Sequence, residues 1–316
     1  MADVSIIGAG VIDVIAGAVD EKILTDDIHE MNYIKMAFGG DALNEAVALS
    51  RLGKKVQLIS NVGDDDAGQR ILDYAAQNGL DVSGVTIQAG LETSITVVLV
   101  DGRGERFFLT NPRSSMRKFS EADILPHIDG LAPIVSFASM FISRALDAAA
   151  MERLFRRIKA SGRTLAVDMK TPKHGETLSD LAGALSHADY FFPNESELAT
   201  LTGEDDVQQN ISALLACGLK CAVVKRGGKG CIIATESAQI EIPACRVEKV
   251  IDTTGAGDSF AAGFLWALSE GWRLEDCGRF ACAAANCSIE VVGAVDGVTS
   301  LEKVMRRYED GQCDVA

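Results

Sequence analysis

The sequence predicts an α/β fold in which helices cover a mainly parallel sheet. Strand-like and helix-like segments alternate from about residue 56 to 240, an order that joins parallel strands through helices. With 316 residues, of which 47% are apolar and 24% charged, the chain can bury the core of one large domain, or of a large and a small one. No internal repeat or low-complexity linker separates the segments.

The expected elements follow one another regularly along the chain. An opening strand at 4–7 precedes a glycine pair and an apolar helix that ends near Gly53. Next we expect a strand at 56–61, helices at 67–78 and 148–160, strands at 164–168 and 190–192, and two strands at 221–224 and 231–234 joined by a turn. The C-terminal part is expected to be helical at 259–268 and 274–291.

Two segments interrupt this alternation. Residues 11–18 and 95–110 are rich in β-branched and apolar side chains and lack helix-start signals. They resemble antiparallel strands inserted beside the main sheet. The sequence therefore predicts a second, smaller sheet.

The run Asp252-Thr253-Thr254-Gly255-Ala256-Gly257-Asp258 carries the strongest chemical signal in the chain. Its small residues let backbone N–H groups approach a phosphate, and the helix that follows adds its positive dipole end. Asp258 would lie in the first helical turn, where the dipole favours the ionised carboxylate and where it could accept a proton from a substrate hydroxyl. An ordinary helix cap would use the same residue types.

This run resembles the C-terminal signature of the ribokinase-like (PfkB) carbohydrate kinases. A second segment, Gly39-Gly40-Asp41-Ala42-Leu43-Asn44-Glu45-Ala46, resembles the N-terminal signature of that family, more than 200 residues away. The resemblance covers nearly the whole chain. It implies a three-layer α/β/α domain with a small β-sheet lid, and an ATP-dependent sugar kinase in which Asp258 is the base and Gly255, Ala256 and Gly257 form the anion hole.

The resemblance also implies where the sugar binds. Asp13, Gly39, Gly40 and Asn44 would hold substrate hydroxyls, and Arg106 on a lid strand would meet the substrate. Local explanations exist for two of them, because Asn commonly lies near helix starts and Arg106 could be a solvated charge on an edge strand.

Nucleotide and metal residues are expected in four places. Asn194 and Glu197 match the family's N-x-x-E motif near the triphosphate, with Glu197 acting on Mg²⁺ through water, although acidic residues at a helix start are also common. Asp252 would bind a monovalent cation, facing the loop 293–299. The remaining nucleotide candidates implied by the resemblance are Lys225, Gly227, Gly230, Thr254, Cys282 and Asn286.

Domain organisation is predicted from the same resemblance. Residues 1–316 would form a single kinase domain, with lid strands inserted at about 12–37 and 93–112. Lid strands of this family often contribute to a dimer interface, so a homodimer through the lid is expected. The implied cofactors are ATP and Mg²⁺, and a K⁺ requirement stays open.

The substrate is less well determined. Ala138 and Ser139 occupy the strand end where ribokinases carry a substrate-binding Glu, and Asp168-Met169-Lys170 matches the D-x-N-x-R of fructokinases and ketodeoxygluconate kinases only in part. A nucleoside is an alternative to a sugar, because Tyr33, Phe107 and Phe108 could stack on a base. A non-catalytic sugar or nucleotide sensor is a weaker alternative, since the proposed base and anion hole are both intact.

Several function classes are excluded or disfavoured. Gly8-Ala9-Gly10 lacks the third glycine of a dinucleotide fingerprint, and no P-loop or protein-kinase motif occurs. A formal charge of −15 disfavours nucleic acid as a partner, and the apolar runs are too short to cross a membrane. The eight cysteines lack the spacing of a zinc site, which favours a reducing, cytoplasmic location.

Overall fold

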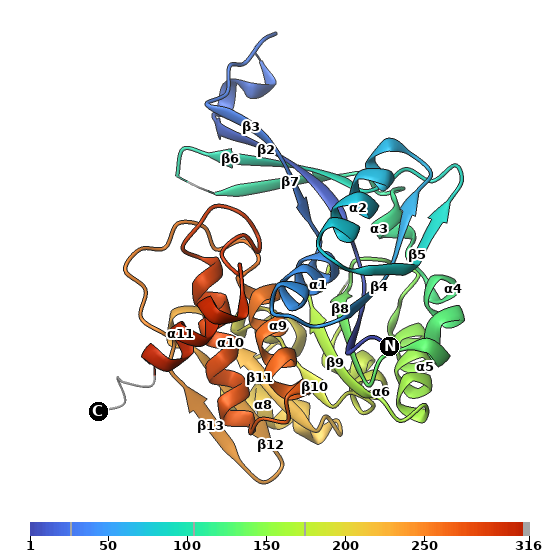
Figure 1. The fold of residues 1–316 in the computed structure, drawn as a ribbon, viewed down its shortest axis with the longest axis vertical. Helices are drawn as coiled ribbons and strands as arrows, with labels where there is room; N and C mark the ends of the chain where they lie inside the picture. Colours follow the sequence, from blue (N-terminus) through green and yellow to red (C-terminus); the bar gives the residue numbers. More distant parts are fainter. Residues whose placement is uncertain (26, 104, 174, 312–316) are drawn as a thin grey trace.

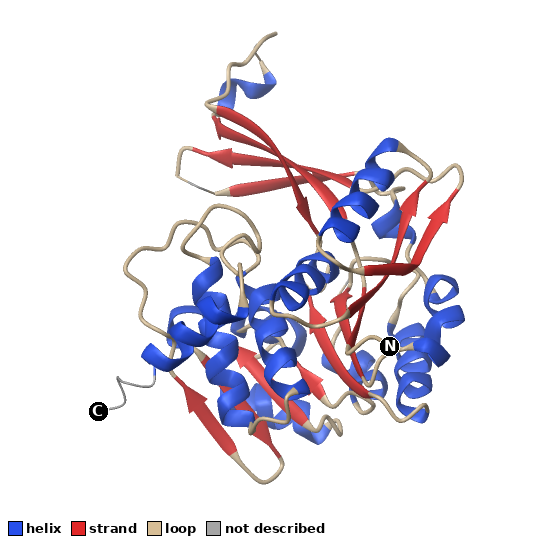
Figure 2. Ribbon diagram, viewed as in Figure 1, coloured by secondary structure: helices blue, strands red, loops and turns tan. Residues whose placement is uncertain are grey.

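The computed structural model describes residues 1–25, 27–103, 105–173 and 175–311, and its strands form two sheets (Figures 1 and 2). Within these residues the larger sheet has nine strands. In order across the sheet they are β13 (Gln239–Ile242), β12 (Cys231–Thr235), β11 (Cys221–Lys225), β10 (Tyr190–Phe191), β9 (Thr164–Met169), β8 (Ile134–Met140), β1 (Val4–Ile7), β4 (Val56–Gly63) and β5 (Asp81–Gln88).

The seven neighbouring strands from β11 to β5 across this sheet all run parallel to one another. Strands β12 and β13 continue the sheet beyond β11 as antiparallel strands. All four residues of β1 are buried, as expected for a strand covered on both faces. The predicted α/β fold is therefore confirmed. The expected turn between β11 and β12 is a short 3₁₀ segment, η3 (Gly227–Lys229).

Helices cover both faces of this sheet (Figure 2). One face carries α1 (Asp41–Arg51), α2 (Asp66–Gln77), α9 (Ala256–Ser269) and α10 (Leu274–Ser288), with α11 (Leu301–Gly311) packed on α10. The other face carries α4 (Glu121–Ile124), α5 (Ala148–Ala160), α6 (Leu178–Leu185), α7 (Glu195–Thr202) and α8 (Val207–Ala216). Short elements η2 (Leu125–Gly130) and α3 (Ser115–Lys118) complete the connections on the N-terminal half.

Local sequence explains where several of these helices begin. Asp65 caps α2 by accepting a hydrogen bond from Gly68 N at 2.8 Å, and Asp147 caps α5 by accepting one from Ala150 N at 2.8 Å. Such caps satisfy N–H groups that have no partner inside the helix. Helix α9 instead begins after Gly255, which provides no side-chain cap, so the N–H groups of Gly257 and Asp258 are left for a ligand.

The smaller sheet consists, within the described residues, of β3 (Tyr33–Gly39), β2 (Val11–Val19), β6 (Ile95–Asp101) and β7 (Arg106–Thr110), in that order. It rises above the N-terminal ends of α1 and α9 (Figure 1). Between β2 and β3 lies the 3₁₀ segment η1 (Glu21–Leu24). Residues 26 and 104, which fall within the expected lid insertions, lie outside the described residues.

One detail of the expected pairing is corrected. Strand β2 is antiparallel to β3, but it runs parallel to β6, and β6 in turn is antiparallel to β7. A parallel pair needs a long crossover, and here the chain from β3 through α1 to β5 supplies it. Sequence spacing between 18 and 95 does not reveal which strand direction results. Among the described residues, no helix combines the length and apolar character needed to cross a membrane.

A buried strand residue provides a test of this core. Ile233 on β12 is 1% exposed, whereas Ile87 on the edge strand β5 is 55% exposed. Because Ile233→Ala leaves a cavity between sheet and helices, it should lower the free energy of unfolding by about 2–5 kcal/mol. The same change at Ile87 should cost less than about 1 kcal/mol. Urea unfolding of both variants measures this; equal losses would contradict the packing described.

Candidate active site

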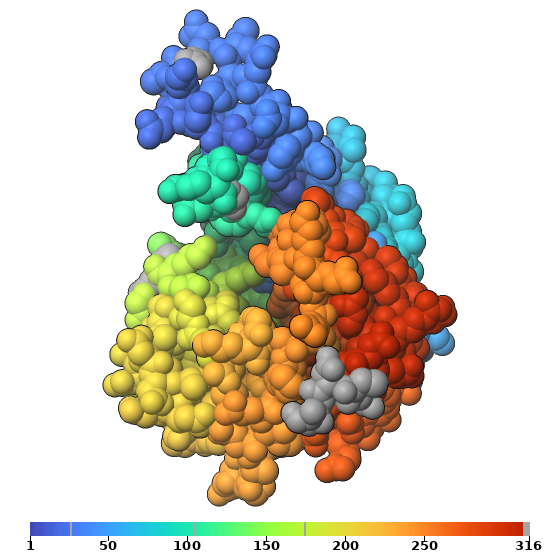
Figure 3. Space-filling model, turned by 90° about the vertical axis from the view of Figure 1, so that its left-hand side faces the viewer, coloured from blue at the N-terminus to red at the C-terminus, as the bar shows by residue number. Residues whose placement is uncertain are grey.

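The candidate site lies where the carboxyl ends of β1, β8 and β9 meet the N-terminal ends of α1 and α9. Ligands of open α/β sheets bind at this edge of the sheet. The smaller sheet overhangs the same region, and Figure 3 shows the surface hollowed beneath it. Most residues predicted from the sequence come to this edge from segments far apart in the chain.

Helix α9 presents its N-terminus to the site. Gly255 precedes the helix with a φ of 69°, and a Cβ atom there would lie 2.0 Å from the carbonyl oxygen of Ala294. Only glycine fits this combination of positive φ and close packing. Because they lie in the first turn, the N–H groups of Gly257 and Asp258 have no helical acceptor. The helix start can therefore bind an anion.

Asp258 is buried in this first turn, and its Oδ2 accepts a hydrogen bond from Nδ2 of Asn44 at 2.7 Å. Burial raises the pKa of Asp258 to about 6, helped by the negative charge of Asp41, while Lys170, Asn44 and Lys225 oppose the shift. Desolvation therefore outweighs the helix dipole, which alone would favour ionisation. At neutral pH the carboxylate is still mostly ionised and can accept a proton.

A second group of charges surrounds the glycine pair. Gly40 has a φ of 94°, and Cβ atoms on Gly39 and Gly40 would lie 2.3 Å from Asp13 Oδ2 and 2.4 Å from the Ala9 carbonyl oxygen. The glycines thus allow Asp13 to approach the start of α1. Burial, with the charge of Asp41, raises the pKa of Asp13 to about 6. Lys170 Nζ lies 2.8 Å from Asp41 Oδ1.

Lys225, at the end of β11, joins this group from the other side. Its Nζ donates hydrogen bonds to both oxygens of Asp168, at 2.9 and 2.7 Å. A Cβ on Gly257 would lie 3.4 Å from the same Nζ, so the ammonium borders the helix start. Burial alone would lower the pKa of Lys225, but the charges of Asp168 and Glu197 outweigh it and raise the pKa.

Two of the three glycines in the turn after Lys225 were predicted to face the nucleotide, and their surroundings differ. Gly227 has a φ of 54° and open space around it. Gly230 has a φ of 89°, and a Cβ there would lie 1.9 Å from the carbonyl oxygen of Ile242. Packing against the chain after β13 therefore explains Gly230 without any ligand.

Asn194 and Glu197 form a reciprocal helix cap. Asn194 Oδ1 accepts a hydrogen bond from Glu197 N at 2.8 Å, and Glu197 Oε2 accepts one from Asn194 N at 2.9 Å. The capping explanation of this pair is therefore realised in the structure. The backbones of Asn194 and Lys225 form an isolated parallel bridge, and the Glu197 carboxylate lies within electrostatic reach of Lys225.

Asp252 and Arg106 contact each other, although the sequence separates them by 146 residues. Arg106 Nη2 on β7 donates to Asp252 Oδ1 at 2.6 Å, and Nη1 donates to Thr254 Oγ1. Partial burial would raise the pKa of Asp252, but hydrogen bonds from Thr254, Arg106 and Gly293 outweigh it and lower the pKa. Arg106 also lowers the pKa of Asp13 through its charge, so it lies near both groups.

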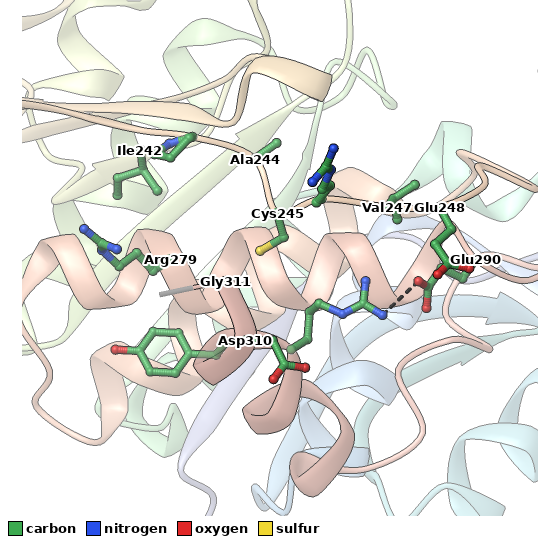
Figure 4. A pocket seen from close by; sticks show the side chains of 13 residues that line it. Ile242, Ala244, Cys245, Val247, Glu248, Arg279, Glu290, Asp310 and Gly311 are labelled. Carbon is green, nitrogen blue, oxygen red and sulfur yellow. Dashed lines mark hydrogen bonds and ion pairs between the residues drawn. The ribbon is translucent and has the colours of Figure 1, made fainter. Parts of the chain in front are cut away.

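Cys282 and Asn286 lie apart from the catalytic candidates, on α10. Asn286 Nδ2 donates to the Cys245 carbonyl oxygen at 2.9 Å, and its Oδ1 accepts from Arg307. Both partners line a cavity of about 740 Å³ between the loop after β13 and helices α10 and α11 (Figure 4). Cys282 is buried, and a hydrogen bond to Cys231 and burial raise the pKa of its thiol.

The structure thus brings most predicted residues to one edge of the sheet and leaves Cys282 and Asn286 beside the cavity. It gives contacts to four charged residues that the sequence had offered only as parts of motifs: Asp41, Glu45, Asp168 and Lys170. It also adds three residues that the sequence did not single out: Arg51, Cys245 and Arg307. Glu45 is fully buried beside Asn44, and burial, followed by the charge of Asp168, raises its pKa well above the usual range. Charged residues within apolar segments were the signal available for Glu45 and Asp168.

Comparisons with known proteins identify the relatives of this chain and of its fold. The chain is 27% identical to fructokinase-1 of Oryza sativa subsp. japonica, over 86% of this chain and 88% of that protein. It is 28% identical to a nucleoside kinase of Methanocaldococcus jannaschii, over 86% and 85% of the two chains. The fold matches the structure of Arabidopsis thaliana ribokinase complexed with ribose and ATP, with a TM-score of 0.82, 24% identity, and coverage of 98% and 99%.

A family model described as the pfkB family carbohydrate kinase matches residues 1–301. That match spans nearly the whole chain, including both glycine-rich signatures. The relatives are named kinases that act on sugars or nucleosides. The chain therefore belongs to the pfkB family of carbohydrate kinases and is a phosphotransferase with an alcohol group as acceptor.

Proposed function

We propose that this enzyme transfers the γ-phosphoryl group of ATP to a primary hydroxyl of a small carbohydrate, with Asp258 as the base. The observation that carries this proposal is the buried Asp258, held by Asn44 and set in the open first turn of α9. A base beside an anion-binding helix start suits phosphoryl transfer, which depends on positioning and charge stabilisation.

In this mechanism the substrate hydroxyl gives its proton to Asp258 while its oxygen attacks the γ-phosphorus in line. The bond from that phosphorus to the β–γ bridging oxygen breaks, and ADP leaves with the bonding electron pair. The backbone N–H groups of Gly255, Ala256, Gly257 and Asp258 would stabilise the charge that develops on the transferred group. Asp13, Gly39, Gly40 and Asn44 would hold the other sugar hydroxyls, with Arg106 entering from β7. The ammonium of Lys225, beside Gly257, would neutralise phosphate charge.

The nucleotide would extend from α9 toward the cavity beside α10. Lys225, Gly227, Gly230 and Thr254 would face its phosphates, together with Asn194. The cavity of about 740 Å³ is large enough for a base and ribose, with Asn286 and Cys282 beside its wall. Part of the proposal is that ATP is the donor; the ribokinase structure of similar fold is complexed with ribose and ATP.

Magnesium would be held at Glu197 through water and by the phosphates themselves. The buried Glu197 carboxylate keeps one oxygen outside the helix cap and lies within electrostatic reach of Lys225. Carboxylate and phosphate oxygens with retained water suit Mg²⁺, which when bound neutralises charge on the phosphates. Among the described residues no three His, Cys, Asp or Glu side chains are arranged to hold a metal by themselves.

We further propose that residues 1–316 act as one kinase domain whose smaller sheet is a lid. Closure over the hollow beneath it would exclude water, so that ATP is not simply hydrolysed. We also propose that the enzyme acts in the cytoplasm, because its eight cysteines favour a reducing compartment. A nucleoside is the second candidate substrate, because Tyr33, Phe107 and Phe108 are 39%, 52% and 63% exposed on the lid and could stack on a base.

Release of ADP from ATP and Mg²⁺, measured across pentoses, hexoses, sugar acids, phosphosugars and nucleosides, tests this function. One substrate class should give turnover, and Asp258→Asn should lower kcat by about 10²–10⁴-fold because the proton acceptor is lost. Asp205→Asn, an exposed carboxylate distant from the site in the loop before α8, serves as the control and should keep full activity. Bound ATP without turnover on any substrate, or full activity of Asp258→Asn, would contradict the proposal.

The pH dependence of kcat/KM should show an acid limb near pH 6. The pKa of Asp258 is raised to about 6, so the active carboxylate form is present above this pH and is lost as the pH falls through it. Asp41 contributes to the raised pKa through its negative charge. Asp41→Asn should therefore move the acid limb to lower pH. An acid limb that stays at the same pH, or that moves to higher pH, would show that it does not report the ionisation of Asp258.

The lid also supports a proposed homodimer. Seven of its described side chains are apolar and exposed, far more than scattered surface residues would supply: Tyr33, Ile34, Met36, Ile95, Phe107, Phe108 and Leu109. We propose that a second copy of the chain covers them. Light scattering should give a dimer mass, and Met36→Asp should reduce it toward that of a monomer. Ile87→Asp on β5 should leave the mass unchanged; a monomeric wild-type protein at micromolar concentration would refute the dimer.

A further inference from the structure

The carboxylate of Asp252 is already surrounded by donors. Its Oδ1 accepts hydrogen bonds from Thr254 N at 2.9 Å, Thr254 Oγ1 at 2.7 Å and Arg106 Nη2 at 2.6 Å. Its Oδ2 accepts one from Gly293 N at 3.2 Å. The carboxylate is 11% exposed, so little of it is left for another partner. The positive charge beside it comes from the Arg106 guanidinium.

In the facing loop, residues 293–299, backbone carbonyl oxygens likewise accept hydrogen bonds from basic side chains. Arg51 at the end of α1 donates from Nη1 to the Val295 carbonyl oxygen at 2.8 Å. Lys303 on α11 donates from Nζ to the Gly297 carbonyl oxygen at 2.9 Å. Two backbone oxygens of this loop, like Asp252, are therefore bound by basic side chains. The three cations come from β7, α1 and α11.

These surroundings do not fit a bound monovalent cation. Such an ion needs several oxygen lone pairs directed at one point, but here Asp252, Val295 and Gly297 direct theirs at N–H donors. An ion beside Asp252 would also be repelled by the guanidinium, since like charges about 4 Å apart cost several kcal/mol at the dielectric constant of a protein surface. The donor set thus disagrees with the cation site that resemblance to the family implies.

We propose that the Arg106 guanidinium takes the place of a monovalent cation and holds the anion-binding loop in position, so that phosphoryl transfer proceeds without K⁺. This inference rests on the proposed kinase function. The loop 293–299 in turn packs on the helix start, because Gly255 lies against the Ala294 carbonyl. Fixing Asp252 and Gly293 therefore fixes the N–H groups at Gly255, Ala256 and Gly257.

The position of Arg106 links this contact to the lid. Arg106 lies on β7, an outer strand of the smaller sheet, and donates to Asp252, which precedes helix α9 beside the larger sheet. The cation that holds the loop is thus carried by the smaller sheet and does not come from solution. Arg106 is therefore a positioning residue that acts through Asp252 and Thr254.

The test compares wild-type protein with Arg106→Gln, Arg106→Lys and the control Arg103→Gln, another arginine near the same hairpin that is 76% exposed. Turnover is measured in choline chloride, in KCl and in guanidinium chloride at equal, low concentration. Wild type and Arg103→Gln should be equally active in choline and K⁺. Arg106→Gln should lose at least about tenfold in kcat in choline and recover part of it with K⁺ or guanidinium, while Arg106→Lys should retain more activity.

Thermal unfolding of the same proteins gives a readout that needs no turnover. An ion that binds only the folded protein raises Tm with its concentration. The Tm of wild type should be the same in choline and KCl, and that of Arg106→Gln should rise in KCl alone. K⁺ activation of wild type, with a matching rise in Tm, would overturn the proposal. If no substrate gives turnover but the Tm of wild type is the same in choline and KCl, the kinase function is refuted. The assignment of Arg106 as the group that replaces the cation would still stand.

Discussion

The hydrogen bond between Asn44 and Asp258 is the contact on which the organisation of this site depends. It joins the first turns of α1 and α9, which are 214 residues apart in the sequence and pack on the same face of the sheet. Both helices start at glycines with positive φ, and no side chain caps either start. The amide and the carboxylate hold each other where these two helix starts meet.

Charge balance around this contact explains the perturbed titration behaviour. Several carboxylates are crowded at the strand ends, and burial raises the pKa of Asp13 and Asp258 to about 6 and that of Asp168 to about 7. Lys170 and Lys225 offset part of that cost by pairing with Asp41 and Asp168. Buried charges contribute little to the stability of a fold, so this cluster is better explained by the chemistry of the site than by a structural role.

Local sequence patterns predicted a functional feature of this chain where all of its residues lie at a single helix start. The run around Gly255 predicts an anion-binding turn, and the structure has the positive φ and open first turn that it requires. Asn194 and Glu197 show the limit of the same reasoning. Their spacing fits both a functional motif and a reciprocal helix cap, and the cap is what the side chains form. One local geometry serves both purposes, so spacing alone cannot separate them.

The sequence by itself determined the alternation of strands and helices, the glycine turns and the positions of the candidate base and anion-binding helix, because these depend on periodicity and on backbone conformations a few residues long. Only the tertiary structure decided that β2 runs parallel to β6, that Lys225 pairs with Asp168 and that Arg106 reaches Asp252. These contacts join segments 57 to 146 residues apart. No local propensity encodes such pairs, because the order of strands in the two sheets brings them together.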